Sequence, residues 1–214
     1  MKSARTDLLA STLLGLLFAV LLATPVTAQQ KQAPTMPFQL TSSEFSSDST
    51  LPISMILNVV QNGVNLCSID GSMGRDQSPE LSWSNAPEHT QSYVVVTYDD
   101  TAAFTHWGMY NIPGTATGLP ANAGVAGSTY GSQIANDFYA AEYDGPCPPP
   151  GVAPTVHHYV FTVYALDTTL SLPGSPNFAP NAETLYHALI SAGRFHHILA
   201  TARLVGLYST TPAK

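Results

Sequence analysis

Short apolar stretches, separated by proline and glycine, run through most of the chain and predict β-strands. The stretch Tyr93–Tyr98 is rich in β-branched and aromatic residues and is apolar on both faces, which favours a strand in the middle of a sheet. Similar strand signals lie at 106–112, 159–166 and 203–208, and weaker ones lie at 38–40 and 81–83. Many short strands with abundant turn residues between them favour a β-sandwich or barrel over a parallel α/β sheet.

A single helix is expected late in the chain. From Glu183 onward, apolar residues recur at the spacing of one helix face. They are Leu185, Ala188, Leu189, Ala192 and Phe195. Gly193 weakens the end of this helix. The fold class that the pattern indicates is therefore mostly β, with one late short helix.

Residues 1–28 have the pattern of a secretory signal peptide. Lys2 and Arg5 precede an apolar run from Leu8 to Leu22, and Val26-Thr27-Ala28 offers the small residues that a signal peptidase reads. The run is shorter than the roughly 20 residues that span a bilayer. This favours cleavage after the small residues over a retained anchor, and no cysteine follows the run to carry a lipid. We expect a periplasmic or secreted protein with no membrane span after cleavage.

The rest of the chain divides into a short lead-in and one domain. Residues 29–37 are polar and contain prolines, which is typical of a flexible segment, and residues 38–210 show no internal linker or repeat. The formal net charge is -7, and the signal peptide removes one net positive charge from the rest. Such an acidic chain argues against nucleic-acid binding. A bound anion would have to be held by a local pocket rather than by the general field of the protein.

Cys67 and Cys147 are the two cysteines of the chain. In an exported protein an even pair indicates a disulfide, and only one pairing is possible here. A bridge between residues so far apart in sequence should stabilise the fold by a few kcal/mol. The alternative is a pair of buried free thiols.

The common catalytic motifs are absent from the sequence, which has no G-x-S-x-G, H-E-x-x-H, P-loop or G-x-G-x-x-G. What remains is a set of polar residues at the ends of expected strands. Asp99 follows the first of these strands, His106 opens the next and His157 precedes a third. If neighbouring strands carry them, the three side chains converge at one mouth. A carboxylate that fixes each imidazole's tautomer would leave the opposite ring N–H free to donate to an oxyanion.

In order and spacing, the segments of this chain resemble the phosphatidylethanolamine-binding protein family, in its bacterial Raf-kinase-inhibitor-like branch. The resemblance extends from about Leu40 to Tyr208. The segments that carry it are Ser78–Trp83, Tyr93–Asp99, His106–Trp107 with Asn111–Pro113, Asn136–Phe138, Tyr143–Pro149, His157–Asp167 and His197–Ala200. No single segment is decisive, and their combined order makes the match specific.

The resemblance implies a β-sandwich with a small pocket that accepts phosphate-type head groups. The family's pocket positions correspond here to Asp99, His106, Pro148, His157 and Tyr159. Exported relatives join cysteines placed like Cys67 and Cys147, so the resemblance also favours the disulfide. It implies an anion rather than a metal ion in the pocket, and no cofactor is expected.

Two departures from the family pattern bear on this pocket. Where family members usually read D-P-D-A-P, this chain reads Asp99-Asp100-Thr101-Ala102-Ala103, and the stretch up to His106 is shortened. The rim is expected to be less rigid there, without the second carboxylate. His158 stands where arginine is more frequent, and alternation along a strand should turn it away from the side of His157.

We therefore expect a binding protein for a small anion, and not an enzyme. His106 and His157 would donate to a phosphate, a phosphoryl ester or a carboxylate, and Asp99 would orient them. Tyr159 would form a wall or donate its hydroxyl, and the loop of Pro148 would form the rim.

Three other uses of the same residues remain open. The pocket could take a side chain or terminus of a protein partner, as an inhibitor of a protease or kinase does. A hydrolase with an imidazole as general base is the second alternative, and a metal site built from two histidines and an aspartate is the third. His197 is expected to cap the late helix rather than to line the pocket.

Overall fold

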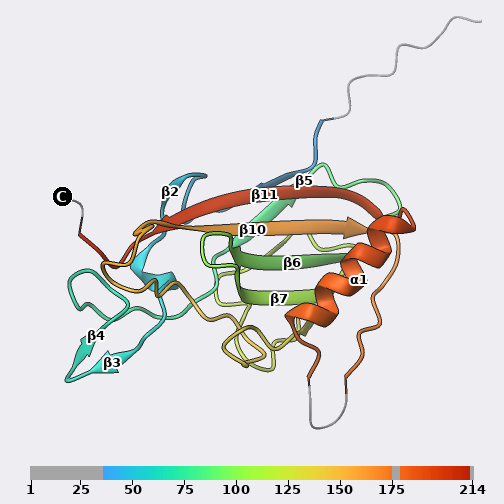
Figure 1. Cartoon of the computed structure of the whole chain (residues 1–214). Helices are drawn as coiled ribbons and strands as arrows, with labels where there is room; N and C mark the ends of the chain where they lie inside the picture. The colour runs from blue at the N-terminus through green and yellow to red at the C-terminus, as the bar shows by residue number, and fades with distance from the viewer. Residues whose placement is uncertain (1–35, 175–178, 213–214) are drawn as a thin grey trace, which may run out of the picture. The chain divides into compact units, whose positions relative to one another are not determined.

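The computed structural model describes residues 36–174 and 179–212, and its largest feature is a six-stranded sheet (Figure 1). The order of the strands is β2-β11-β10-β6-β7-β9. Their bounds are Ser49–Thr50 (β2), Ile198–Tyr208 (β11), His157–Leu166 (β10), Ser92–Asp99 (β6), Phe104–Pro113 (β7) and Ser132–Gln133 (β9). Neighbours run antiparallel, except that β2 lies parallel to β11. The four strongest strand signals of the sequence all belong to this sheet.

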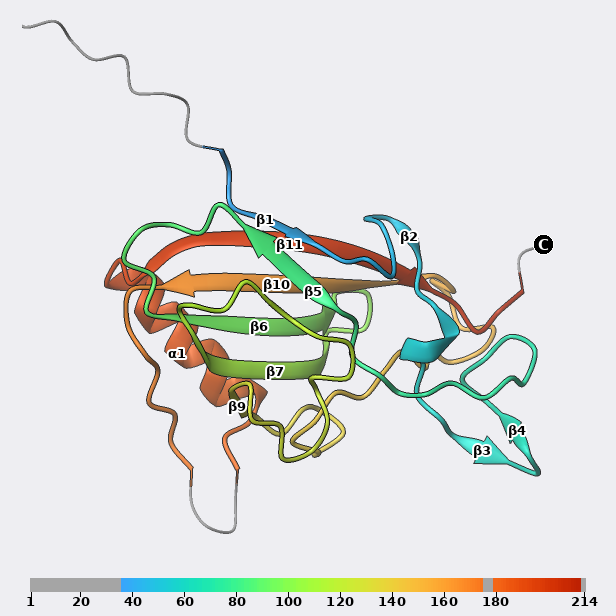
Figure 2. The same cartoon turned by 180° about the vertical axis from the view of Figure 1, so that it is seen from behind.

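A smaller, three-stranded sheet covers one face of the large sheet, as Figure 2 shows for β1 and β5. Its strands are β1 (Gln39–Thr41), β5 (Leu81–Ser84) and β8 (Gly118–Leu119). Helix α1 (Ala182–Arg194) lies on the opposite face. A short 3-10 helix spans Ile53–Met55, and a hairpin is formed by β3 (Val60–Gln61) and β4 (Val64–Asn65). The predicted fold class, mostly β with one late helix, is confirmed.

Strand β6 is buried on both faces because each face packs against a different layer. Tyr93 and Val95 belong to the core between the two sheets, whereas Val94 and Val96 belong to a second core beneath α1. Alternate side chains point to opposite faces of a strand. The run is apolar at every position because both faces of β6 are covered. The strand lies in the middle of the sheet, as expected.

Helix α1 starts at a reciprocal cap. The side chain of Asn181 accepts a hydrogen bond from the N–H of Thr184 at 3.0 Å, and the Thr184 hydroxyl accepts one from the N–H of Asn181 at 2.9 Å. Leu189 and Ala192 are buried, as the periodicity predicts. Phe195 continues the apolar spacing, but the helix ends one residue before it and the residue is 65% exposed.

Cys67 and Cys147 form a disulfide, which joins the segment after β4 to the loop that leads into β10. Within residues 36–174 and 179–212, no helix has the length and apolar character needed to cross a membrane. The predicted signal peptide, 1–28, and residues 29–35 of the lead-in lie outside the described residues. Both therefore stay predictions.

Candidate functional site

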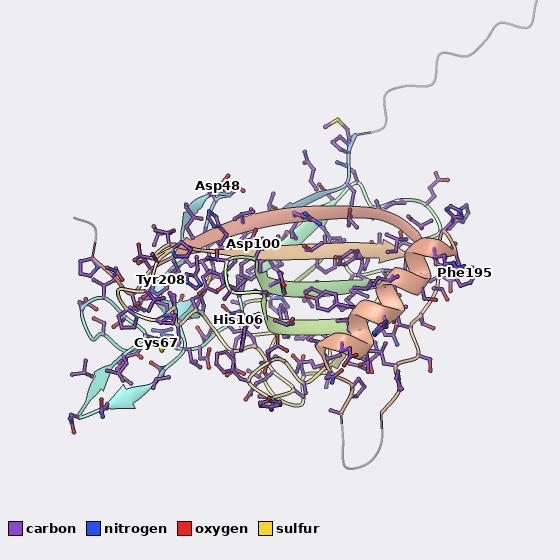
Figure 3. The ribbon with its side chains drawn as sticks, viewed as in Figure 1. Asp48, Cys67, Asp100, His106, Phe195 and Tyr208 are labelled. Atoms are coloured by element: carbon purple, nitrogen blue, oxygen red, sulfur yellow. A yellow bond between two sulfur atoms is a disulfide. The ribbon has the colours of Figure 1, made fainter. Side chains whose placement is uncertain are left out.

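A hollow with a volume of about 240 Å³ lies where β6 ends and β7 and β10 begin. Because β6 is antiparallel to both neighbours, its end and their starts meet at one edge of the sheet. The residues that line the hollow are Asp99, Ala102, Phe104, His106, Phe138, Cys147, Pro148, Pro149, His157 and Tyr159. All five positions that the resemblance singled out are among them. Figure 3 places His106 near this end of the sheet and Phe195 near the other.

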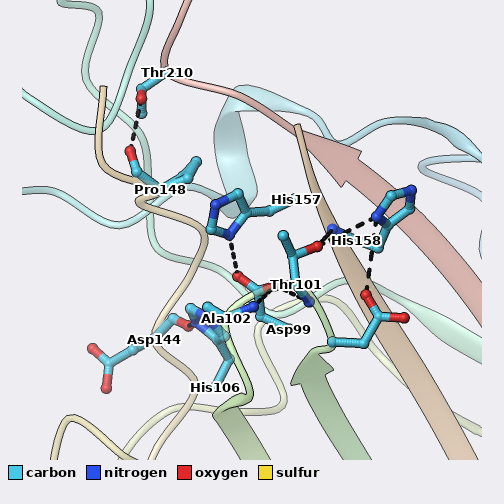
Figure 4. A network of polar contacts seen from close by, with 10 residues as sticks. Asp99, Thr101, Ala102, His106, Asp144, Pro148, His157, His158 and Thr210 are labelled. Atoms are coloured by element: carbon cyan, nitrogen blue, oxygen red, sulfur yellow. Dashed lines mark hydrogen bonds and ion pairs between the residues drawn. The ribbon is translucent and has the colours of Figure 1, made fainter. Parts of the chain in front are cut away.

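Asp99 and His157 form a buried pair at the floor of the hollow (Figure 4). The Nδ1 atom of His157 lies 2.6 Å from Oδ2 of Asp99. The residues are only 2% and 6% exposed. The other carboxylate oxygen of Asp99 accepts hydrogen bonds from the N–H groups of Thr101 at 2.9 Å and Ala102 at 3.1 Å. Both oxygens are thus occupied, which fixes the carboxylate and orients the imidazole.

His106 is held by a different partner from the one expected. Its Nδ1 donates to the backbone carbonyl of Asp144 at 2.7 Å, and no hydrogen bond joins it to Asp99 among the described residues. The Asp144 carboxylate in turn accepts from the side-chain amide of Asn136 at 2.6 Å. Burial lowers the pKa of His106, against an opposing contribution from the Asp144 carbonyl and from the nearby carboxylates. The expectation that Asp99 orients both rings is therefore wrong for His106.

The Nε2 atoms of His106 and His157 are open polar atoms of the hollow, which the side chain of Tyr159 also lines. Neither has a hydrogen-bond partner among the described residues. In that part of the chain, the one enclosed side-chain nitrogen or oxygen without a partner is Thr97 Oγ1. Both Nε2 atoms are therefore reached by solvent, and the hollow is the space that both rings line.

Aromatic rings hold the two imidazoles in place. Tyr159 packs edge-on to His106, with centroids 5.1 Å apart, and stacks on His157 at 6.4 Å. Phe104 and Phe138 contact each other at 4.7 Å and both contact His106. The sequence did not single out these two phenylalanines as site residues. Phe138 belongs to one of the segments that carry the resemblance, and this was the one sequence feature that could have pointed to it.

The rim loop is fastened at three points. The disulfide fixes Cys147, and the hydroxyl of Thr210 donates to the carbonyl of Pro148 at 2.7 Å. The N–H of Gly145 donates to the carboxylate of Asp76 at 2.6 Å. A Cβ at Gly145 would lie 1.9 Å from the carbonyl oxygen of Met55, so only glycine fits there.

The segment after Asp99 lacks the prolines that family members usually have there, and hydrogen bonds hold it instead. Ala103 has a φ of 55°, which a proline ring cannot adopt. The hydroxyl of Thr101 accepts a hydrogen bond from the N–H of His158 at 3.0 Å and thereby ties the segment to β10. These hydrogen bonds tie the segment to Asp99 and to β10, and the lower rigidity of the rim stays a prediction.

The other histidines lie away from the hollow. His158 points away from the side of His157, and its side chain is 51% exposed, as strand alternation predicts. The N–H of His197 donates to the carbonyl of Ala192 at the end of α1, and its ring lies 2.8 Å from Asp167. In the described part of the chain, no three His, Cys, Asp or Glu side chains are grouped to hold a metal ion.

Known proteins similar to this chain include several from bacteria and archaea. A family model described as phosphatidylethanolamine-binding protein matches residues 41–209. The protein YbcL of Escherichia coli is 34% identical over 179 residues, which cover 80% of this chain and 87% of YbcL. A UPF0098 protein of Methanothermobacter thermautotrophicus is 38% identical over 141 residues, which cover 63% of this chain and 84% of that protein.

Two solved structures are similar to this chain in fold and sequence. The crystal structure of Escherichia coli YbcL, described as a new member of the mammalian PEBP family, has a TM-score of 0.65 at 32% identity and covers 81% of this chain and 99% of that one. A putative phosphatidylethanolamine-binding protein homologue from Chlamydia trachomatis has a TM-score of 0.60 at 28% identity. The match covers 81% of this chain and 97% of that one. From the matched segments and the shared fold, the chain belongs to the phosphatidylethanolamine-binding protein family.

Proposed function

We propose that this protein is an exported binding protein whose pocket holds a small anionic group, such as a phosphate, a phosphoryl ester or a carboxylate. The observation that carries the proposal is the buried contact of 2.6 Å between His157 and Asp99 at the floor of the hollow. A carboxylate is the counter-ion that a positively charged imidazole needs when it is buried. The ring's second N–H is then left to donate to an anion.

The size and walls of the hollow suit a small group. Its volume of about 240 Å³ lies below the roughly 300–1,000 Å³ of pockets for drug-sized ligands. Apolar side chains form most of the wall, and the two open Nε2 atoms are among its polar groups, with Asp99 and Tyr159. Hydrogen bonds made beside such apolar walls are stronger than those made at an open surface.

Binding also fits the lining better than hydrolysis does. Among the described residues that line the hollow there is no serine, threonine or lysine, and the sulfur of Cys147 is held in the disulfide. Turnover would need water activated by an imidazole. A panel of phosphomonoesters and carboxylic esters, followed for product release, tests this. Multiple turnovers that disappear in His157→Gln would replace the binding proposal.

Export is supported by three observations. Residues 1–28 have the pattern of a signal peptide, and disulfides persist in oxidising compartments. A protein named putative lipoprotein LppC, from Mycobacterium tuberculosis, is 30% identical over 137 residues, which cover 63% of this chain and 61% of that protein. Expression of the full chain in a bacterial host, followed by fractionation, tests the proposal. We expect a periplasmic product that begins at Gln29, and a cytoplasmic product that retains Met1 would contradict export.

Isothermal titration with inorganic phosphate and phosphoethanolamine tests the pocket directly. His157→Gln should weaken binding of both by roughly tenfold or more, because it removes a hydrogen bond to a charged group. His158→Gln is the matched control, since this neighbouring histidine is exposed and outside the hollow. Circular dichroism checks that both variants fold. Equal affinity in His157→Gln and the unmodified protein, or no binding by the unmodified protein, would refute the site.

A second candidate function is binding of a protein partner at the same opening. Tyr139 is 92% exposed and has a φ of 67°, and it follows Phe138 of the wall. Non-glycine residues held in the left-handed region cluster at functional sites, and exposed tyrosine is common at interfaces. A partner whose binding is lost in Tyr139→Ser, while phosphate affinity is unchanged, would favour this function.

A further inference from the structure

We infer that the protein carries a second ligand site, on the face of the large sheet beside α1, and that this site binds a carboxylate attached to an aromatic ring. The site is a groove of about 470 Å³, called here the sheet groove, whose lining includes Tyr98, Thr162, Tyr164, Tyr186 and Arg203. No residue lines both the sheet groove and the hollow at the end of β6. The inference therefore goes beyond the proposed function and does not depend on it.

The sheet groove exists because α1 covers only part of the large sheet (Figure 1). Leu185 and Leu189 of the helix pack with Val96 in the core beneath it. Beside the helix, Thr162 of β10 lies between its partners Val96 of β6 and Arg203 of β11. Cross-strand partners point to the same face of a sheet. This row of three strands therefore forms a floor that is open to solvent on the side of α1.

Arg203 supplies the positive charge of the sheet groove. The described residues contain three arginines and no lysine, and Arg203 is the only one of these arginines in the lining. Its guanidinium forms no ion pair with a carboxylate of the described residues. A guanidinium presents its N–H groups in a planar fork that matches the two oxygens of a carboxylate. The charge of the groove is therefore complementary to a carboxylate ligand.

A tyrosine hydroxyl adds a second donor close to this charge. Burial raises the pKa of Tyr164, and the nearby positive charge of Arg203 acts in the opposite direction. The phenol therefore keeps its hydrogen at neutral pH and can donate to an anion. Asp100 is the one carboxylate of the lining, and it lies 3.9 Å from His158. With one cation and one acidic neighbour, the groove suits a ligand with a single negative charge better than a dianion.

Two tyrosine rings form the aromatic part of the site. Tyr98 of β6 and Tyr186 of α1 meet edge to face, with centroids 6.1 Å apart and planes at 83°. A flat ring placed in this corner stacks on one tyrosine and meets the edge of the other. Strand β10 separates β6 from β11, so the corner and Arg203 arise from strands that lie about 10 Å apart. The ligand therefore needs a short arm between its ring and its carboxylate.

Calorimetric titration with phenylpropanoate tests the site. We expect saturable binding with a Kd below about 1 mM. Phenylpropanamide has nearly the same shape but no charge, and it should bind more weakly by roughly tenfold or more. Cyclohexylpropanoate keeps the charge but has no aromatic ring, and its affinity should be lower by about threefold to tenfold.

Matched variants locate the binding. Arg203→Gln should weaken phenylpropanoate binding by roughly tenfold or more, because it removes the charged partner. Arg194→Gln is the control, since this exposed arginine ends α1 outside the sheet groove. Tyr98→Leu should remove most of the preference for phenylpropanoate over cyclohexylpropanoate. Arg203 is exposed, so its variant should fold, which circular dichroism checks.

The same titration separates this site from the hollow. His157→Gln changes the hollow alone and should leave the affinity for phenylpropanoate unchanged. Loss of phenylpropanoate binding in that variant, with Arg203→Gln unaffected, would place the acid in the hollow and overturn the second site. An absence of saturable binding up to about 10 mM would overturn the inference and leave the proposed function intact.

Arg203 has one structural role that the test must also separate. Strand β11 pairs with β2 only at Gly206 and Leu207, so Arg203 lies on an open part of its edge. A charged side chain there discourages pairing with other chains. If Arg203→Gln binds phenylpropanoate as the unmodified protein does and instead associates with increasing concentration, protection of the edge replaces ligand binding as the role of Arg203. Light scattering of both proteins measures this association.

Discussion

The Nδ1 atom of His157 lies 2.6 Å from the carboxylate of Asp99, and one residue further along both segments a second pair repeats the same two residue types. His158 and Asp100 lie 3.9 Å apart, and their side chains are 51% and 56% exposed, against 8% and 3% for the first pair. Strand alternation puts the two histidines on opposite sides of β10. The protein therefore contains its own control for the buried pair.

Asp99→Asn should weaken phosphate binding by roughly tenfold or more and lower the free energy of unfolding by about 2 kcal/mol. The two oxygens of Asp99 accept from His157 and from backbone N–H groups. An amide has one oxygen, so its NH₂ must face a donor on one side. Titration calorimetry and urea unfolding measure the two effects.

Asp100→Asn serves as the control for this experiment. Exposed ion pairs contribute little to stability, so both measurements should be nearly unchanged in this variant. Equal effects of the two substitutions would show that general acidity, and not the buried pair, governs binding.

Removal of the disulfide should destabilise the fold by about 2 to 5 kcal/mol, because Cys67 and Cys147 are separated by 80 residues. The bridge also fixes the rim beside Pro148, so phosphate affinity should fall as well. Urea unfolding of the Cys67→Ala, Cys147→Ala double variant measures the loss. The unmodified protein in reductant should approach the same midpoint, and a midpoint that does not move in either case would argue against a structural role.

The fold could be predicted well because its strongest signal is local. The run Tyr93–Tyr98 must be buried on both faces, and a central strand between two layers is the arrangement that achieves this. The two-residue strands β8 and β9 could not be predicted, because so short a stretch has no periodicity. The end of α1 could not be read from the spacing, because Phe195 continues the apolar pattern after the helix has ended at Arg194.

The side chains of the candidate site could be predicted from the sequence, but their backbone partners could not. Asp99, His106 and His157 stand at strand ends, and the resemblance joined them to Pro148 and Tyr159. The partner of His106 could not be predicted, because it is a backbone carbonyl and any residue at position 144 supplies one. The hydrogen bond that orients the His106 ring therefore becomes visible only in the folded chain.

Thr97→Val should stabilise the protein by about 1 kcal/mol. The hydroxyl of Thr97 is enclosed and has no partner among the described residues, so the folded protein loses the hydration of this group without replacing it. Valine has nearly the same shape and suits a strand. Thermal or urea unfolding measures the change.

Thr210→Val is the matched comparison for this substitution. Thr210 is also buried, but its hydroxyl donates to the carbonyl of Pro148. This change should destabilise the fold by about 1 kcal/mol, since it leaves that carbonyl unpaired. If Thr97→Val also lowers the free energy of unfolding, the enclosed hydroxyl of Thr97 has a hydrogen-bond partner in solution.

Asp76→Asn should remove part of the pH dependence of stability. Burial raises the pKa of Asp76 from 3.8 to about 6, with smaller contributions from Asp144 and Glu142, while the hydrogen bond from Gly145 acts in the opposite direction. The buried Tyr143 hydroxyl lies in the same cluster. A carboxyl with a raised pKa in the folded state favours folding most below about pH 4 and loses that contribution as the pH rises to about 6.

At pH 7 the charged carboxylate of Asp76 therefore weakens the fold, by about 1 kcal/mol once its partial exposure is taken into account. Asparagine can still accept from the N–H of Gly145 and tolerates the positive φ of 52° at this position. We expect the variant to be more stable at pH 7 and the difference to vanish near pH 4. Urea unfolding of both proteins across this range gives the difference curve. A variant that is less stable at pH 7 would show that the charged hydrogen bond to Gly145 outweighs burial.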